Sequence, residues 1–446
     1  MLRSLAILAL LLAVATAPVR AADAASSPAV PAAAQSHFKS GQELRKSGDL
    51  NGAIREFSEA IEHGGKTADI YSERAKALFA QGELSRAIAD YDLALRLNPN
   101  DAFCYVNRGV CLLQTGKNQP ALDDLNRAVE LLPNKAIIRR NRAAILIRLG
   151  KFDSAQQDLA KAISIDPWAK DYAMQEQIFF VRKDIPRAQE AINKAIELDP
   201  KQAIYYYDRA QLLILQNKMR EAIADLNKAI ALGGNYYLDR ALAYIDMGEY
   251  NRAAQDTDSE LAIKPDQAAV LYRVRGVAHQ RLQEYQDAFK DYSLSLKADP
   301  NCVETREQLA DLFIETGDYD KALVECSRAI ELAPSANAYK HRAIAHAYKR
   351  EFEPALSDYD RAVELDPNDA ALYYDIGNMH YEQKNYDGAI ASCSKALTLN
   401  PAYEKALFTR ANAFFCKRDF DAAIKDYNQA AVLEPTKPSI YRNCSY

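Results

Sequence analysis

Apolar and polar positions follow two superimposed periods along most of the chain, one short and one long. Prolines mark the long period. They fall at 99, 133, 167, 200, 265, 300, 334, 367, 401 and 435, and Gly234 takes the place of the proline that this series lacks between 200 and 265. With this proline numbered 32, positions 4, 8 and 11 form one apolar face and positions 20, 24 and 27 form another, at helical spacing. Each repeat is therefore expected to form two amphipathic α-helices. A Gly or polar pair near position 15 separates them, and Asn-Pro or Asp-Pro often ends the second.

Small residues recur where the two helices of a repeat must approach each other closely. Position 8 is Ala or Gly in most repeats, and position 20 is Ala in all twelve, from Ala53 to Ala423. The repeat that begins near Ala169 departs from this pattern with Glu176 at position 8, and the seventh repeat has Glu260 where Ala is usual. Because one such repeat cannot bury its apolar faces alone, the pattern predicts an all-α stack of about twelve repeats.

This pattern resembles the tetratricopeptide repeat family, and the resemblance covers residues 34–435. It implies a right-handed α-solenoid, a superhelix of helix-turn-helix repeats whose first helices line a concave groove. It further implies that side chains at positions 2, 5, 9, 12 and 13 face that groove, where a partner protein or an extended peptide binds.

The groove positions of the last two repeats carry aromatic and amide side chains, which could hold the amides of an extended peptide. The predicted peptide-binding residues are Tyr374, Asn378, Tyr381, Phe408, Asn412 and Phe415. In repeats three to seven these positions are largely apolar, as at Val106 and Leu113, and the alternative there is packing between repeats or self-association. The family's clamp for chaperone carboxylates needs Lys at position 5 and Asn at position 9. Lys340 is followed by Ile344 instead, so a co-chaperone role is not expected.

Arginine at position 7 always occurs together with aspartate at position 23 of the same repeat. Because the planar guanidinium can donate two hydrogen bonds to one carboxylate, we expect an ion pair between the two helices of each such repeat. The alternative is a ladder of arginines that binds an anionic ligand. The predicted pairs are Arg74 with Asp90, Arg108 with Asp124, Arg142 with Asp158, Arg209 with Asp225, Arg240 with Asp256, Arg275 with Asp291, Arg342 with Asp358 and Arg410 with Asp426.

The rest of the sequence contains few signals of catalysis or of ligand binding. The formal net charge is −5, which argues against a nucleic-acid-binding surface, and neither a phosphate-binding loop nor a metalloprotease or nucleophile-elbow motif occurs. We therefore expect no enzyme activity, no cofactor and no metal. His279, His346 and His380 share position 11 and could form a metal site or a pH-sensitive row, although packing in place of Tyr is the favoured interpretation.

The N-terminus has the anatomy of a secretory signal peptide over residues 1–21, with cleavage after Ala21 or Ala24. An uncleaved anchor is the alternative, and no later segment is apolar for long enough to span a bilayer. A linker over 22–33 and a short tail over 436–446 flank the array. We expect an exported scaffold, periplasmic in a Gram-negative source and otherwise secreted or envelope-associated. The alternative is a homo-oligomeric structural component of a cell-envelope assembly, with Cys444 available for intermolecular pairing.

Overall fold

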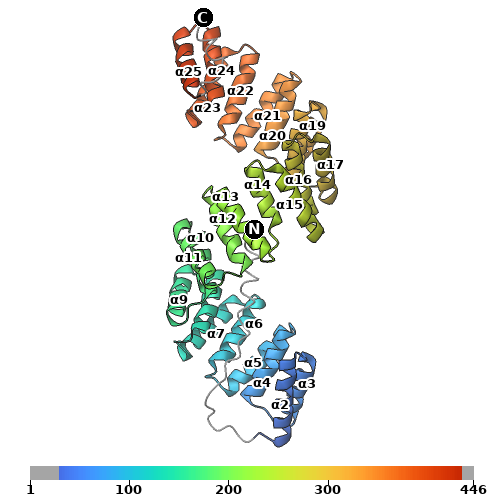
Figure 1. Ribbon diagram of the computed structural model, residues 1–446, viewed down its shortest axis with the longest axis vertical. Helices are drawn as coiled ribbons and strands as arrows, with labels where there is room; N and C mark the ends of the chain where they lie inside the picture. Colours follow the sequence, from blue (N-terminus) through green and yellow to red (C-terminus); the bar gives the residue numbers. More distant parts are fainter. Residues whose placement is uncertain (1–29, 434–446) are drawn as a thin grey trace. The chain divides into compact units, whose positions relative to one another are not determined.

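The computed structural model describes residues 30–433, which form 24 α-helices and one short 3-10 helix (Figure 1). No strand occurs within this range, so the predicted all-α class is confirmed. The predicted signal peptide, most of the linker and the tail lie outside the described residues. The first helix begins at Ala32, two residues before the expected start of the array. Across residues 30–433 no helix combines the length and the apolar content needed to cross a bilayer.

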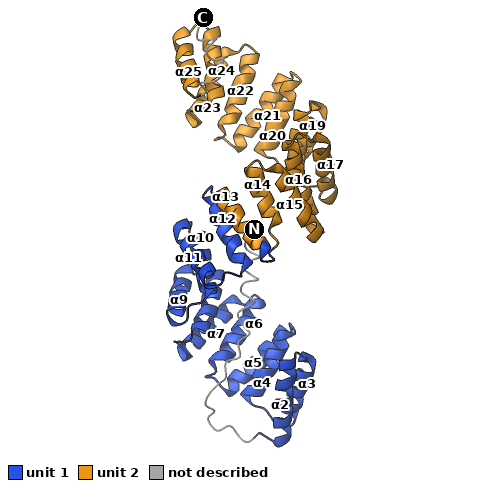
Figure 2. Ribbon diagram, in the orientation of Figure 1, with its two compact units in different colours: residues 1–218, 231–234 blue, residues 219–230, 235–446 orange. Residues whose placement is uncertain are grey.

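The chain divides into two compact units (Figure 2). Unit 1 spans residues 1–218 and 231–234, and unit 2 spans residues 219–230 and 235–446. The helices of unit 1 are α2 (Ala32–Ser47), α3 (Leu50–Glu62), α4 (Ala68–Ala80), α5 (Leu84–Leu97), α6 (Ala102–Gln114), α7 (Asn118–Leu131), α8 (Ala136–Arg148), α9 (Phe152–Ile165), α10 (Ala169–Val181), α11 (Ile185–Leu198) and α12 (Ala203–Leu215).

The helices of unit 2 follow the same order of first and second helices. They are α13 (Met219–Ala231), α14 (Tyr237–Asp246), α15 (Tyr250–Ile263), the 3-10 helix η1 (Pro265–Gln267), α16 (Ala268–Arg281), α17 (Tyr285–Ala298), α18 (Val303–Glu315), α19 (Tyr319–Leu332), α20 (Ala336–Tyr348), α21 (Phe352–Leu365), α22 (Ala370–Glu382), α23 (Tyr386–Leu399), α24 (Glu404–Cys416) and α25 (Phe420–Leu433).

Helices pack in consecutive pairs that correspond to eleven of the twelve predicted repeats, and the two helices of the sixth, α12 and α13, belong to different units. Within each unit, the first and second helices of a repeat pack together, as α22 does with α23, and the second helix packs on the first helix of the next repeat. First helices of neighbouring repeats also touch directly, as α18 does with α20 and α22 with α24. Each unit is therefore an α-solenoid in which the first helices share one side of the stack.

The turn inside every repeat contains one residue in the left-handed region. This conformation ends the first helix and lets the chain reverse. Six of the twelve residues are glycines, for which a positive φ carries no steric cost, and six are not. They are Gly48, Gly82, Gly116, Gly150, Lys183, Asn217, Gly248, Gln283, Gly317, Arg350, Lys384 and Arg418.

Alanine at position 20 is at most 1% exposed in all twelve repeats, which explains why no larger residue occurs there. The large side chain at position 24 fills the space beside it, and Tyr91, Tyr292 and Tyr427 are among the most completely buried side chains. A Cβ added to Gly276, at position 8, would lie 2.7 Å from the ring of Tyr292. The small residues therefore allow the two helices to close over an aromatic ring.

The two irregular repeats keep the helix pair. Glu176 and Glu260 are both buried within their units, where the other repeats have small residues. The Glu260 carboxylate accepts a hydrogen bond from the backbone N–H of Leu238 at 3.3 Å and lies 3.5 Å from Lys264. Local hydrogen bonding of this kind compensates for the burial of a charged side chain.

Candidate functional site

The arginine at position 7 lies against the aspartate at position 23 of its own repeat in seven of the eight predicted pairs. In each, Nε and Nη2 of the guanidinium donate to the two carboxylate oxygens over 2.5–2.9 Å. Arg209 and Asp225 belong to different units, and their pairing stays a prediction. The seven pairs are Arg74 with Asp90, Arg108 with Asp124, Arg142 with Asp158, Arg240 with Asp256, Arg275 with Asp291, Arg342 with Asp358 and Arg410 with Asp426.

These pairs are held away from bulk water. All seven aspartates are buried, and the arginines are half-buried. The hydrogen bonds to Asp90 and Asp256 raise the pKa of Arg74 and Arg240 above the ordinary value, because they stabilise the charged guanidinium. An arginine held in this way is not available to an anionic ligand.

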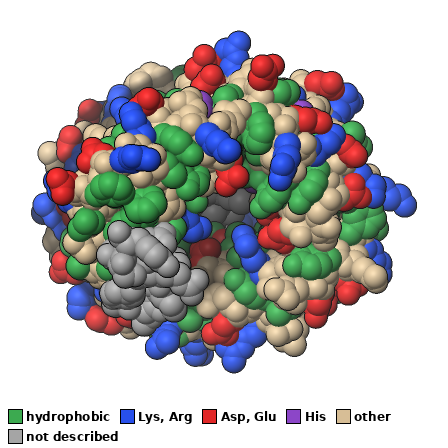
Figure 3. Space-filling view, turned by 90° about the horizontal axis from the view of Figure 1, so that it is seen from above, with side chains coloured by type: hydrophobic (Ala, Val, Ile, Leu, Met, Phe, Trp, Pro, Cys, Tyr) green, Lys and Arg blue, Asp and Glu red, His purple; other side chains and the backbone are tan. Residues whose placement is uncertain are grey.

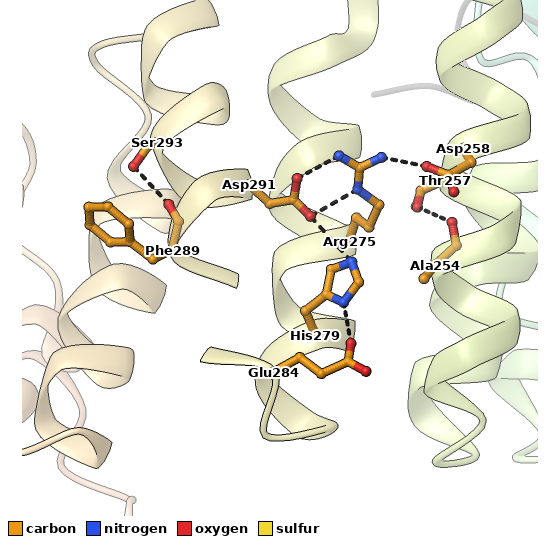
Figure 4. A network of polar contacts seen from close by, with 9 residues as sticks. All are labelled: Ala254, Thr257, Asp258, Arg275, His279, Glu284, Phe289, Asp291 and Ser293. Carbon is orange, nitrogen blue, oxygen red and sulfur yellow. Dashed lines mark hydrogen bonds and ion pairs between the residues drawn. The ribbon is translucent and has the colours of Figure 1, made fainter. Parts of the chain in front are cut away.

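Each arginine also makes a third contact, which the sequence analysis missed. In all eight repeats its Nη1 donates to a polar residue on the second helix of the preceding repeat, so in the seven repeats with an ion pair one guanidinium links three helices. In Figure 4, Arg275 lies between Asp291 and Asp258. The acceptors sit two residues after position 23, a polar position that could have signalled the contact. They are Ser58, Asp92, Asn126, Asn193, Asn227, Asp258, Ser327 and Ser394.

The three histidines at position 11 contact the turn of their own repeat. His279 and His346 lie 2.6 Å from Glu284 and Glu351, five residues further on, and His380 lies 3.4 Å from Asn385. Figure 4 shows this contact for His279, whose other ring nitrogen is 3.7 Å from Asp291. They are half-buried and hydrogen-bonded rather than packed in the core in place of Tyr.

Potential metal ligands do not gather anywhere in the described part of the chain. Over residues 30–433 no group of three or more His, Cys, Asp or Glu side chains is placed to hold a metal ion. The histidines at position 11 each contact a partner within five residues, which ties them to separate turns. In the described structure these histidines stabilise the turns through side-chain hydrogen bonds.

The apolar side chains of the early repeats are largely used in packing. Val106 and Leu113 are buried in the core of unit 1, and Ile137 and Ile147 pack against the same cluster. The expectation that these residues face a groove is wrong for Val106 and Leu113, because the neighbouring repeat covers them.

The first helices of repeats eleven and twelve, α22 and α24, present a row of aromatic rings that we call the aromatic surface. It comprises the six predicted residues Tyr374, Asn378, Tyr381, Phe408, Asn412 and Phe415. All are half-buried except Phe415, which is 40% exposed. Each ring packs on an aromatic neighbour at a centroid distance of 5.3–5.9 Å: Tyr374 on Tyr403, Tyr381 on Tyr386, Phe408 on Tyr427 and Phe415 on Phe420.

The two asparagines of the aromatic surface differ in their contacts. The side-chain oxygen of Asn412 accepts a hydrogen bond from the Tyr427 hydroxyl at 2.5 Å, which ties it to the second helix of its own repeat. No hydrogen bond joins the side-chain amide of Asn378 to another described residue. Asn378 therefore presents a half-buried amide that can donate to, and accept from, the backbone of a bound peptide.

Charged residues on the same side of unit 2 are partly paired between repeats. Asp311 accepts a hydrogen bond from Gln280 at 3.0 Å, and Glu307 accepts one from Ser335. Lys340 lies 3.6 Å from Asp369 at the start of α22. On the face drawn in Figure 3, basic and acidic side chains are intermixed, unlike the continuous basic surface typical of nucleic-acid binding.

Comparison with known proteins gives the same family as the repeat pattern. A family model described as tetratricopeptide repeat matches residues 38–102, 178–237, 273–337 and 341–404, and a second model of that description matches residues 141–167. Hsp70-Hsp90 organizing protein 3 of Arabidopsis thaliana is 26% identical over 213 residues, which are 46% of this chain and 38% of the relative. Stress-induced-phosphoprotein 1 of Caenorhabditis elegans is 26% identical over 195 residues, 42% of this chain and 59% of the relative.

Solved structures of similar fold include yeast Tom70, with 20% identity, a TM-score of 0.46 and coverage of 92% of this chain and 95% of that chain. A crystal structure of MamA protein has 26% identity and a TM-score of 0.34, and covers 39% of this chain and 95% of that chain. The chain spans less than two thirds of the length of the curated relatives named above. The family models match more than half of the residues, and the chain belongs to the tetratricopeptide repeat family.

Proposed function

We propose that this protein is an exported scaffold that binds an extended segment of a partner protein on the aromatic surface of α22 and α24, without catalysis. The observation that carries the proposal is the arrangement of Asn378 among half-buried rings. The rings are held by their neighbours before any ligand arrives, so little ordering is needed on binding. A polar amide among them offers the backbone recognition that an extended peptide needs.

The names of the relatives support a scaffold role. Two of the matched proteins are named as organizers of Hsp70 and Hsp90. The aromatic surface lacks the Lys and Asn combination expected for chaperone carboxylates, since Asn378 follows Tyr374 and Asn412 follows Phe408. A different partner is therefore expected for this chain, because a shared fold does not fix a partner.

The experiment is a pull-down from cell-envelope extract with the chain from residue 22 onward as bait. Asn378→Ala removes the unpaired amide and leaves the contact between Asn412 and Tyr427 intact. The matched control is Asn428→Ala, an exposed asparagine on α25. The proposal predicts a partner retained by the wild type and by the control and lost by Asn378→Ala. Retention of the same proteins by all three baits would contradict it.

Export rests on the N-terminal pattern of residues 1–21, and we propose a periplasmic location in a Gram-negative source. N-terminal sequencing of the protein from fractionated cells tests this. A new N-terminus at Ala22 or Ala25 in the exported fraction is expected, and an intact Met1 in the cytoplasmic fraction would contradict it.

Self-association is the second candidate, and the outer face of α25 favours it. Phe420 is 50% exposed and Ile424 is 48% exposed, whereas Phe352 and Leu356 at the same repeat positions of α21 are partly buried against the core. Light scattering of the wild type and of Ile424→Asp distinguishes the candidates. A wild-type oligomer that becomes a monomer on substitution favours the structural role.

A further inference from the structure

A half-buried carboxylate, Asp375, adjoins the aromatic surface on α22. The groups that influence it come from four helices: Lys340 on α20, Tyr359 on α21, Asp369 and Tyr374 at the start of and within α22, and Tyr403 and Lys405 at the start of and within α24. Over residues 30–433 no donor lies within hydrogen-bond or ion-pair distance of the Asp375 carboxylate.

The two neighbouring lysines do not neutralise this carboxylate. Lys340 is 3.6 Å from Asp369, and Lys405 is exposed. Burial raises the pKa of Asp375 to about 6 because the charged form loses solvation that no partner replaces. A partly buried polar group without a partner destabilises the free protein, because its lost solvation is not replaced. A bound hydrogen-bond donor would offset this desolvation free energy.

The surroundings of Asp375 favour a cation over a neutral donor. The rings of Tyr374 and Tyr403 pack 5.3 Å apart beside it, and aromatic faces attract ammonium and guanidinium groups. Further along the same side of unit 2, α18 carries the exposed carboxylates of Glu304 and Glu315. The unpaired Asp375, together with these two carboxylates, therefore favours a basic partner.

We propose that the aromatic surface receives an extended partner segment with a Lys or Arg side chain whose positive charge pairs with Asp375. This inference rests on the proposed function and names the chemistry of the partner. The rings and Asn378 hold the segment itself, and Asp375 selects the residue that it carries.

The pairing makes binding depend on pH in a defined direction. A bound cation favours the ionised carboxylate, so the peptide binds only the fraction of the protein in which Asp375 is charged. With a pKa of about 6, this fraction falls about tenfold between pH 7 and pH 5. Affinity for a basic peptide should fall by the same factor, whereas affinity for a neutral peptide should change little.

The test uses an array of decapeptides with alternating apolar residues and one fixed central residue: Lys, Arg, Gln or Glu. Binding of the purified chain is measured at pH 7 and pH 5. We expect the wild type to prefer Lys and Arg over Gln by about tenfold, as for a hydrogen-bonded charge pair. Asp375→Asn, nearly the same in shape, should bind the Gln peptides as well as the wild type does and lose both the preference and the pH dependence.

The control is Asp360→Asn, which removes an exposed carboxylate from α21 and should change neither property. Binding without a charge preference, a preference for Glu, or a preference that survives in Asp375→Asn would overturn this inference and leave the peptide-binding surface standing. Failure of every peptide to bind the wild type would overturn both the inference and the proposed peptide-binding function.

Discussion

Replacing Arg108 with methionine should destabilise the third repeat far more than the loss of a surface ion pair would. The Arg108 guanidinium donates to both oxygens of Asp124 at 2.6 and 2.8 Å, and it also reaches Asp92 on α5 at 2.6 Å. Methionine keeps the apolar stem and removes all three contacts, leaving the buried Asp124 carboxylate without its partner.

The magnitude follows from burial. Breaking a fully buried pair costs about 3–5 kcal/mol because one charge stays desolvated. Arg108 is only half-buried, so we expect a loss of about 2–4 kcal/mol in the free energy of local unfolding. The comparison is Arg86→Met, which removes a pair with Glu83 of similar length, 2.7 Å, between exposed side chains; it should cost less than about 0.5 kcal/mol.

Native-state hydrogen exchange of the α6 and α7 amides measures this difference locally, which suits a repeat array whose unfolding need not be two-state. The double variant Arg108→Met/Asp124→Leu removes both charges and should recover most of the loss. If the α6 and α7 amides exchange as slowly in Arg108→Met as in Arg86→Met, the reasoning about the three-helix contact is wrong.

Three further predictions follow from individual residues. Lys384→Gly should raise the free energy of unfolding by about 0.5–1 kcal/mol by relieving a φ of 63°, and Gly82→Ala should lower it by about 1 kcal/mol; chemical denaturation of both checks the pair. Asp375→Asn should stabilise the protein by about 1–2 kcal/mol at pH 7 and by almost nothing at pH 4, because the raised pKa means that stability is lost as pH rises through 6; thermal unfolding at both pH values decides. Burial raises the pKa of the Cys111 thiol to about 12, so iodoacetamide at pH 8 should modify the exposed Cys416 and spare Cys111 until denaturant is added, as read by mass spectrometry.

Most of the fold could be predicted because its signals lie within one repeat. The spacing of apolar residues fixes the two helices, and Ala at position 20 marks the close approach of the helices. The arginine at position 7 and the aspartate at position 23 occur together because they touch within the same repeat. Comparing the twelve repeats of one chain therefore shows which residues occur together, as a comparison of related sequences would.

The contacts between repeats were harder to predict, because they depend on how one helix pair lies on the next. The acceptor Asp258 belongs to the repeat before Arg275, and its role becomes visible only once the two repeats are in contact. Val106 looked groove-facing by position and is covered by packing. The environment of Asp375 likewise depends on Tyr403 from the following repeat.

The most direct test of the central claim, that the aromatic surface holds a partner segment, is site-specific photo-crosslinking in cells. A photo-reactive phenylalanine derivative replaces Phe415, which is 40% exposed, in one variant and Val324, a more accessible residue on α19 that is 65% exposed, in another. We expect a discrete adduct from position 415 that Asn378→Ala abolishes, and none from position 324. No adduct from 415, or the same adducts from both positions, would contradict the account.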